Sequence, residues 1–281
     1  MPDLAMPERR SVHVNGLRIN YLDWGNEQAP PMVCVHGYTG SADAFNAFAR
    51  HFRDRYHVIA PDVRGHGDSE WSKDAAYQYA DQVSDLAGFV DALGLQQFTL
   101  VGTSMGGIIS MAYATERGDR LERLVINDIG PDAEAGSARI TQNVGARPED
   151  FASIEEAVAF RLSMSKNLHS RTESDQRELA AGILKEGPNG RMQWKLDPRY
   201  VTDRVTKGAP ARPALWPVLE ALQCPTLVVW GTASDVLSEA QAKRMVSALP
   251  KGELLPVADA EHAPGLVEPD ALAGLDKFLA R

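Results

Sequence analysis

The chain has 281 residues, of which 44% are hydrophobic and 24% charged, as is usual for a globular protein. Its formal net charge of -9 argues against nucleic acid or an anionic membrane surface as a partner. No run is apolar enough for a signal peptide or a membrane span, so we expect a cytoplasmic protein, with disorder only over residues 1–8. Cys34 and Cys224 each lie in an apolar run, which implies neither a disulfide framework nor a metal site.

Strands and helices are predicted to alternate through the first half of the chain. A hairpin comes first, with two strands joined by the Asn15-Gly16 turn. The predicted strands are 11–14, 17–24, 32–35, 56–61, 98–101 and 121–126, and helical spacing recurs over 44–52, 79–93 and 108–115. Such alternation requires crossover connections, so we predict a mostly parallel α/β sheet with helices on both faces.

This alternation stops between residues 131 and 213. The segment contains two predicted amphipathic helices, 154–164 and 173–184, and no strand of the buried apolar type. The alternation then resumes with a helix at 217–222, a strand at 226–230, a helix at 239–249, a strand at 253–257 and a helix at 269–279. We therefore predict a core formed by 1–130 and 214–281, interrupted by a helical insertion at 131–213.

Ser104 lies where a predicted strand turns into a predicted helix. The surrounding residues read Gly102-Thr103-Ser104-Met105-Gly106, which is the pattern G-x-S-x-G. A glycine two residues to either side allows a sharp turn, because a Cβ there would collide with the neighbouring strand or helix. This turn lifts the serine hydroxyl clear of the sheet beside a helix N-terminus, which favours a developing negative charge. The pattern predicts a nucleophilic serine.

A nucleophilic serine needs a base within hydrogen-bond reach, and the chain has seven histidines. His262 lies in the loop 258–264, which returns to the carboxyl edge of the sheet where Ser104 also emerges. His36, at the end of an early strand, is the alternative. The other histidines occupy positions that favour exposed or structural roles: His13, His51, His57, His66 and His169. We expect His262 to be the base.

The acid that orients this histidine must lie at the carboxyl end of a strand near Ser104. Asp128, after the strand 121–126, meets this condition, and it also has the ordinary alternative of capping the turn that follows. Asp235, after the strand 226–230, meets it equally well. The position of the strands alone leaves both candidates open.

The order of these motifs resembles the α/β-hydrolase superfamily. The matching features are His36-Gly37 after an early strand, the turn-rich segment 62–69, Ser104, Asp235 and His262. The resemblance covers nearly the whole chain outside the insertion, and its details are most similar to the esterase and C–C bond hydrolase branch. Related dehalogenases and epoxide hydrolases have an aspartate at the elbow, whereas this chain has Ser104.

The resemblance implies a role for each site residue. It implies a triad of Ser104, Asp235 and His262, because most of the family takes its acid from the position of Asp235. It also implies an oxyanion hole made by the backbone N–H groups of Tyr38 and Met105. The insertion at 131–213 would be a helical cap over the site. Apart from the resemblance, we assign Gly37 and Trp194 to the substrate pocket, and the alternative for Trp194 is packing within the cap. No metal or organic cofactor is implied.

The function expected on these grounds is a capped serine hydrolase that cleaves a small carboxylic ester through an acyl-enzyme on Ser104. One alternative keeps the triad and changes the bond, giving a C–C bond hydrolase, an amidase or a lactonase. Another is a small-molecule receptor that carries an intact triad and turns over slowly. In each case the expected partner is a small molecule.

Overall fold

The structure of the chain is a computed structural model that describes residues 6–280. The disorder predicted for residues 1–5 lies outside the described residues, and the first strand already begins at Glu8. No helix in the described range is both long and apolar enough to cross a membrane.

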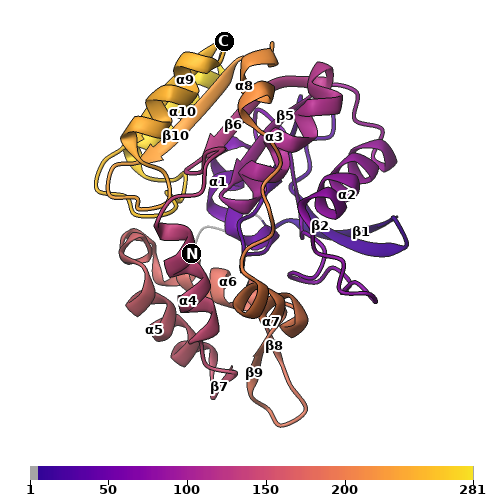
Figure 1. Cartoon of the computed structure of the whole chain (residues 1–281). Coiled ribbons are helices and arrows are strands. Elements are labelled where there is room, and N and C mark those ends of the chain that lie inside the picture. The colour runs from indigo at the N-terminus through magenta and orange to yellow at the C-terminus, as the bar shows by residue number, and fades with distance from the viewer. Residues whose placement is uncertain (1–5, 281) are drawn as a thin grey trace.

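Eight strands form one sheet in the order β1-β2-β4-β3-β5-β6-β10-β11 (Figure 1). They are β1 (Glu8–Val14), β2 (Leu17–Asp23), β3 (Pro31–Val35), β4 (His57–Pro61), β5 (Phe98–Thr103), β6 (Leu121–Asn127), β10 (Thr226–Gly231) and β11 (Gly252–Val257). The predicted hairpin joins β1 and β2, and β2 also runs antiparallel to β4, whereas every pair from β4 to β11 is parallel.

Helices cover both faces of this sheet. One face packs against α2 (Tyr79–Ala92), α3 (Met105–Arg117), α8 (Trp216–Ala221) and α9 (Glu239–Ala248). The other face packs against α1 (Asn46–Phe52) and α10 (Pro269–Leu279). The predicted α/β fold class, a mostly parallel sheet between two helical layers, is therefore confirmed.

The central strand β3 shows why its sequence is apolar without interruption. Val33 and Val35 belong to the core on the α3 side, whereas Met32 and Cys34 belong to the core on the α1 side. Successive side chains of a strand point to opposite faces, so a strand covered on both faces has no position left for a polar residue. Ser104 and its neighbours follow β5, which lies directly beside β3.

The segment 131–213 holds four α-helices and also a small sheet. The helices are α4 (Gly136–Gly145), α5 (Ile154–Met164), α6 (Glu173–Ile183) and α7 (Pro198–Lys207). The sheet is antiparallel, in the order β7-β9-β8, with β7 (Asp150–Phe151), β8 (Leu184–Glu186) and β9 (Met192–Trp194). Figure 1 shows these elements together at the bottom of the view. The segment is mainly helical, as predicted, and the three short strands were not predicted. The boundaries at 131 and 213 stay a prediction about domain organisation.

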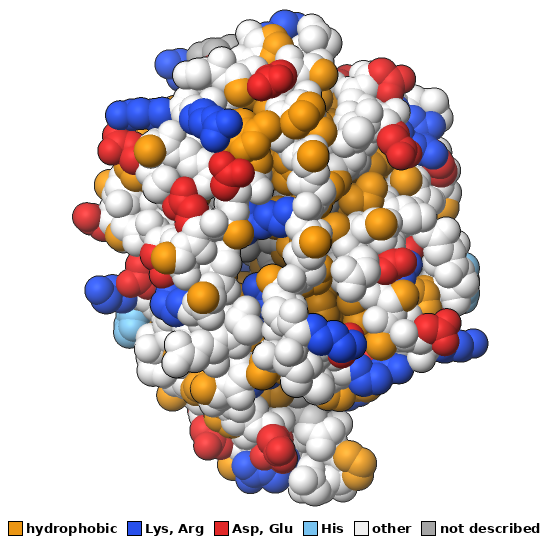
Figure 2. All heavy atoms as spheres, in the orientation of Figure 1, with side chains coloured by type: hydrophobic (Ala, Val, Ile, Leu, Met, Phe, Trp, Pro, Cys, Tyr) orange, Lys and Arg blue, Asp and Glu red, His pale blue; other side chains and the backbone are white. Residues whose placement is uncertain are grey.

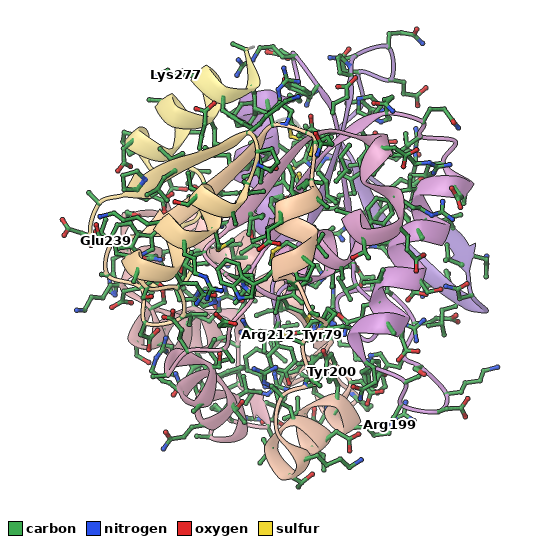
Figure 3. All side chains as sticks on the ribbon, turned by 45° about the horizontal axis from the view of Figure 1, so that its top comes forward. Tyr79, Arg199, Tyr200, Arg212, Glu239 and Lys277 are labelled. Carbon is green, nitrogen blue, oxygen red and sulfur yellow. The ribbon has the colours of Figure 1, made fainter. Side chains whose placement is uncertain are left out.

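Tyr200 attaches the end of this segment to the core. Its ring stacks on that of Tyr77 with 4.6 Å between ring centroids, and its hydroxyl accepts a hydrogen bond from the Gln82 side chain at 3.1 Å. Figure 3 shows Tyr200 with Tyr79 and Arg212 in the same part of the view. Because Gln82 lies in the first turn of α2 and Tyr77 just before it, the segment is held against the start of that helix.

Candidate active site

Ser104 is the single residue between β5 and α3, and its backbone is strained. Its φ is +52° and its ψ is -115°, in the region that L-residues rarely occupy. The strain is held by neighbours, since the Ser104 N–H donates to the Asn127 carbonyl at 2.9 Å. The strand-to-helix turn predicted for the G-x-S-x-G pattern is present.

The two glycines of the pattern are required by close approach of the backbone. A Cβ on Gly106 would lie 2.1 Å from the Val35 carbonyl oxygen, and a Cβ on Gly102 would lie 2.5 Å from the Gly106 oxygen. Neither contact can be relieved by rotating a side chain. Glycine at both positions therefore lets α3 begin directly against β3 and β5.

A chain of hydrogen bonds leads from Ser104 into the protein. Ser104 Oγ lies 2.8 Å from Nε2 of His262, and Nδ1 of the same ring lies 2.8 Å from Oδ2 of Asp128. The structure thus brings together the predicted serine and the predicted histidine, although 158 positions separate them in the chain. His262 comes from the loop between β11 and α10, where it was expected.

Asp128 is fully buried and its second carboxylate oxygen is also bonded. Oδ1 accepts the backbone N–H of Gly231 at 2.9 Å, and the Asp128 N–H donates to the Val229 carbonyl at 2.9 Å. Asp128 follows β6, the strand beside β5, in the register that pairs Asn127 with Thr103. Its strand therefore ends next to Ser104, which puts the carboxylate within reach of the histidine ring.

The expectation that Asp235 contacts His262 is wrong. Asp235 is 44% exposed and forms a two-pronged ion pair with Arg139 of α4, with N–O distances of 2.5 and 2.6 Å. Hydrogen bonding from Arg139 lowers the pKa of the Asp235 carboxyl. The physical reason for the error is position: three residues separate Asp235 from the end of β10, and they carry its side chain out to α4 instead of under the histidine.

The expected oxyanion-hole residues lie at the same corner. Gly37 is so close to Ser104 that a Cβ on it would lie 3.3 Å from the serine Cβ, which places the start of the Tyr38 loop beside the nucleophile. Within residues 6–280, no protein acceptor takes the backbone N–H of Tyr38 or of Met105, the first residue of α3. The role of these two N–H groups stays a prediction.

His36, the alternative base, has both ring nitrogens committed to the backbone. Nε2 accepts the Val63 N–H at 2.9 Å, and Nδ1 donates to the Gly37 carbonyl at 2.8 Å. Burial lowers the pKa of His36 to about 4. The ring therefore braces the loop that carries Tyr38.

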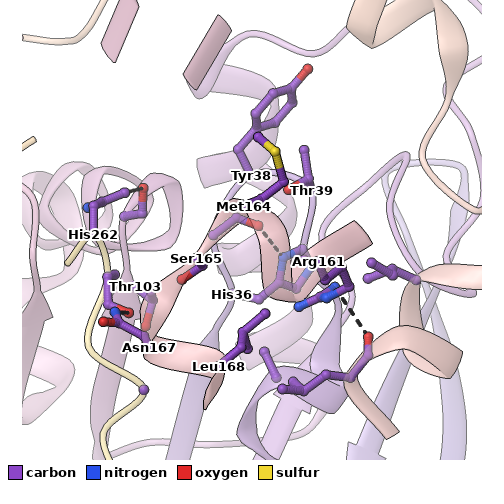
Figure 4. Close-up of a pocket in the computed structure, with 18 of the residues that line it drawn as sticks. His36, Tyr38, Thr39, Thr103, Arg161, Met164, Ser165, Asn167, Leu168 and His262 are labelled. Carbon is purple, nitrogen blue, oxygen red and sulfur yellow. Dashed lines mark hydrogen bonds between the residues drawn. The ribbon is translucent and has the colours of Figure 1, made fainter. Parts of the chain in front are cut away.

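A cavity of about 380 Å³ opens above Ser104 and His262. Core loops supply part of its wall, including Gly37 and Tyr38, and the 131–213 segment supplies the rest, including Trp194. Figure 4 shows Tyr38, His36, Arg161 and His262 around this space. The cavity wall thus contains both residues assigned to the substrate pocket, while Met105 points instead toward the Tyr200 hydroxyl.

Sequence reasoning missed several residues of this site. Asn127 donates to the Pro264 carbonyl at 2.9 Å, and Asn167 donates to the carbonyls of Glu261 and Ala263 at 2.9 and 3.0 Å. Three arginines also line the cavity: Arg147, Arg161 and Arg171. Their only signal in the sequence is a positive charge within the predicted cap. Across residues 6–280 no group of three or more His, Cys, Asp or Glu side chains is arranged to hold a metal.

Comparison with known proteins agrees with this architecture. The model of a family described as alpha/beta hydrolase fold matches residues 30–269. A 3-hydroxybutyrate-oligomer hydrolase of Cupriavidus necator is 34% identical over 93% of this chain and 92% of its own length. The esterase YbfF of Escherichia coli is 28% identical over 86% of this chain and 89% of its own. An α/β hydrolase structure from Novosphingobium aromaticivorans superposes with a TM-score of 0.88 at 30% identity, covering 98% and 99% of the two chains.

Proposed function

Because the chain belongs to the α/β-hydrolase family, a family of hydrolytic enzymes, we propose that it cleaves small carboxylic esters with Ser104 as nucleophile, His262 as base and Asp128 as acid. The observation that carries this proposal is the unbroken chain of two 2.8 Å hydrogen bonds from Ser104 through His262 to Asp128, at the wall of a cavity. Asp128 replaces Asp235 in the assignment.

The first half of the reaction forms the acyl-enzyme. Ser104 Oγ attacks the ester carbonyl carbon while His262 Nε2 takes the hydroxyl proton, and the Asp128 carboxylate stabilises the resulting imidazolium. The carbonyl oxygen becomes an oxyanion that the N–H groups of Tyr38 and Met105 would bind. One such donor typically lowers the barrier by about 3 kcal/mol. The imidazolium then gives its proton to the leaving alcohol as the C–O bond breaks.

The second half releases the acid. Water attacks the acyl carbon while His262 takes one of its protons, and the proton returns to Ser104 Oγ as that oxygen leaves. A carboxylic acid and an alcohol are the products, and the enzyme is restored. The fully buried Asp128 has the same task in both halves, since an imidazolium forms twice.

The relatives support an ester as the bond. The C. necator relative is described as acting on 3-hydroxybutyrate oligomers, which are short oligoesters, and the E. coli relative as an esterase. We propose accordingly that this chain acts on short aliphatic esters, with small molecules as its partners.

Steady-state hydrolysis of p-nitrophenyl butyrate tests the proposal. We expect turnover above about 1 per second, within the usual range for enzymes. Ser104→Ala should lower kcat by about a millionfold. Ser247→Ala, which removes an exposed hydroxyl in α9, is the matched control and should match the wild type. A single stoichiometric release of p-nitrophenol followed by arrest would contradict the proposal and favour a receptor.

A further inference from the structure

The cavity wall is positively charged although the chain as a whole is acidic. Among the described residues that line the cavity, three are arginines and none is Asp or Glu. The formal net charge of the chain is -9. Figure 2 shows Lys or Arg side chains beside the hollow near the middle of that face. This local excess of positive charge favours the binding of an anionic molecule in the cavity.

Arg161 of α5 has few partners in the described chain. Its one hydrogen bond within the described chain is a long one, 3.5 Å, to the Leu179 carbonyl, and no carboxylate there lies at ion-pair distance. Burial lowers the pKa of Arg161 to about 10, so the group is charged at neutral pH without a counter-charge. A desolvated charge of this kind is costly unless a partner compensates it.

Arg147 is in a similar state. Its guanidinium lies 4.5 Å from the centre of the Trp194 ring, and its Nη1 is buried without a hydrogen-bond partner among residues 6–280. Burial lowers its pKa to about 10 as well. Arg171, the third arginine, differs because its Nη2 donates to the Gly265 carbonyl at 2.9 Å and so supports the loop after His262.

Other arginines near the cap do find carboxylates. Arg50 pairs with Glu178 of α6 at 2.7 Å, and Arg177 of the same helix pairs with Glu155 at 2.7 Å. In the described chain no carboxylate lies within ion-pair distance of Arg147 or Arg161, both of which line the cavity. A guanidinium presents a fork of N–H donors that matches a carboxylate bidentately.

We propose that the ester cleaved at this site carries a free carboxylate remote from the scissile bond, bound by Arg161 with Arg147 adding to the positive field. The proposal rests on the hydrolase function proposed above and specifies its substrate class. Figure 4 shows Arg161 and His262 on opposite sides of the drawn pocket. The carboxylate and the scissile ester would therefore occupy opposite ends of one short molecule, such as a half-ester of an aliphatic dicarboxylic acid.

A matched pair of substrates tests this. Mono-p-nitrophenyl adipate carries the free carboxylate, and p-nitrophenyl methyl adipate is its neutral counterpart. We expect wild-type kcat/KM to favour the anionic ester at least tenfold, and Arg161→Gln to lower that ratio at least tenfold, mainly through KM. Arg161→Lys, which keeps the charge and loses the fork, should lie between. The control is Arg177→Gln in the exposed cap pair, which should keep the wild-type ratio.

Equal kcat/KM for the two esters in the wild type would overturn the proposal, as would an unchanged ratio in Arg161→Gln. Loss of the ratio in Arg147→Gln but not in Arg161→Gln would overturn the assignment to Arg161. If neither ester is cleaved, the proposed hydrolase function fails separately, and calorimetry of adipate with Ser104→Ala decides the anion site. Binding that disappears in Ser104→Ala/Arg161→Gln supports it, and no binding to Ser104→Ala refutes it.

Discussion

At the scale of single residues, Asp128 combines two properties that Asp235 lacks. It is fully buried, whereas Asp235 is 44% exposed, and its carboxylate faces His262 instead of an arginine. A negative charge acts more strongly on an imidazolium when water does not screen it. The charge of Asp235 is already paired with that of Arg139, so it would stabilise a second cation less.

Replacing each aspartate by asparagine separates the two. Asp128→Asn should lower kcat by about 10⁴, because an amide sets the wrong tautomer of His262 and gives no charge to the imidazolium. Asp235→Asn should change kcat by less than about threefold, since it loses only a partly exposed ion pair. Steady-state kinetics on p-nitrophenyl butyrate measure both. An inactive Asp235→Asn together with an active Asp128→Asn would contradict this prediction and restore Asp235 as the acid of the triad.

His36 and His66 make folding stability depend on pH. Burial lowers the pKa of His36 from 6.5 to about 4 and that of His66 to about 3. Below pH 6.5 the unfolded chain binds protons that the folded chain refuses, so stability is lost as pH falls from 6.5 toward 4. Asp62 acts in the opposite sense, because burial raises its pKa to about 6 and the folded state holds its proton. The two histidines change the free energy of unfolding by more than the one carboxyl does, so the net effect of lowering the pH is a loss of stability.

We therefore expect the free energy of unfolding to fall by about 3 kcal/mol between pH 6.5 and pH 4, taking about 1.4 kcal/mol per pKa unit and site. Urea denaturation followed by tryptophan fluorescence at several pH values measures it. His36→Gln, which can replace both backbone hydrogen bonds, should flatten the slope, while His13→Gln on the exposed edge of β1 should leave it as it is. A wild-type curve that is flat over this range would rule the explanation out.

At the scale of elements, a short helical turn of the 131–213 segment holds the histidine loop. Asn167 lies in the 3₁₀ turn Lys166–Ser170, donates to the carbonyls on both sides of His262, and accepts the Glu261 N–H at 2.9 Å. Three hydrogen bonds from one side chain fix the loop backbone from the cap side. The segment 131–213 therefore helps to position the His262 loop as well as lining the cavity.

Removal of this amide should reduce catalysis with little effect on binding. Asn167→Ala should lower kcat by about tenfold with KM within about twofold, because the ring of His262 would sample unproductive positions. Asn189→Ala, in the exposed turn between β8 and β9, is the control. Equal kcat and KM for the two variants would show that the loop 258–264 keeps its conformation without Asn167, which would contradict the prediction.

Prediction from the sequence succeeded where apolar residues repeat and failed where they are sparse. The predicted helices 154–164 and 269–279 coincide with α5 and α10. Helices α4 and α7 were missed because they contain few large apolar residues, Ile140 and Val144 in α4 and Tyr200, Val201 and Val205 in α7. Strands β7, β8 and β9, with two or three residues each, are too short to show an alternating pattern.

The residues of the site also fall into those that the sequence could predict and those that it could not. Ser104 could be found because its turn needs glycine on both sides, and His262 because its loop returns to the same sheet edge. Asp128 and Asp235 both follow strands at that edge. The number of residues between each aspartate and the end of its strand decides which of them reaches His262. The unpaired state of Arg147 and Arg161 is a property of packing, and no spacing in the chain reveals it.

At the scale of the whole molecule, the cavity lies between the core loops and the 131–213 segment, and its volume of about 380 Å³ limits the substrate. Small-molecule sites commonly have volumes of this order. The kcat/KM for p-nitrophenyl butyrate should exceed that for p-nitrophenyl palmitate at least tenfold, measured below the critical micelle concentration of each ester. Faster cleavage of the palmitate would mean an open groove and not a closed cap.

The central claim is that Ser104 is the acylated nucleophile and that its reactivity depends on His262 and Asp128. Labelling with a fluorophosphonate, followed by peptide mapping and timed intact-mass measurement, tests it most directly. The wild type should acquire one adduct, on Ser104, and the labelling rate should fall at least a hundredfold in Asp128→Asn and remain unchanged in Asp235→Asn. An adduct on another residue, or equal labelling rates for Asp128→Asn and the wild type, would contradict the claim.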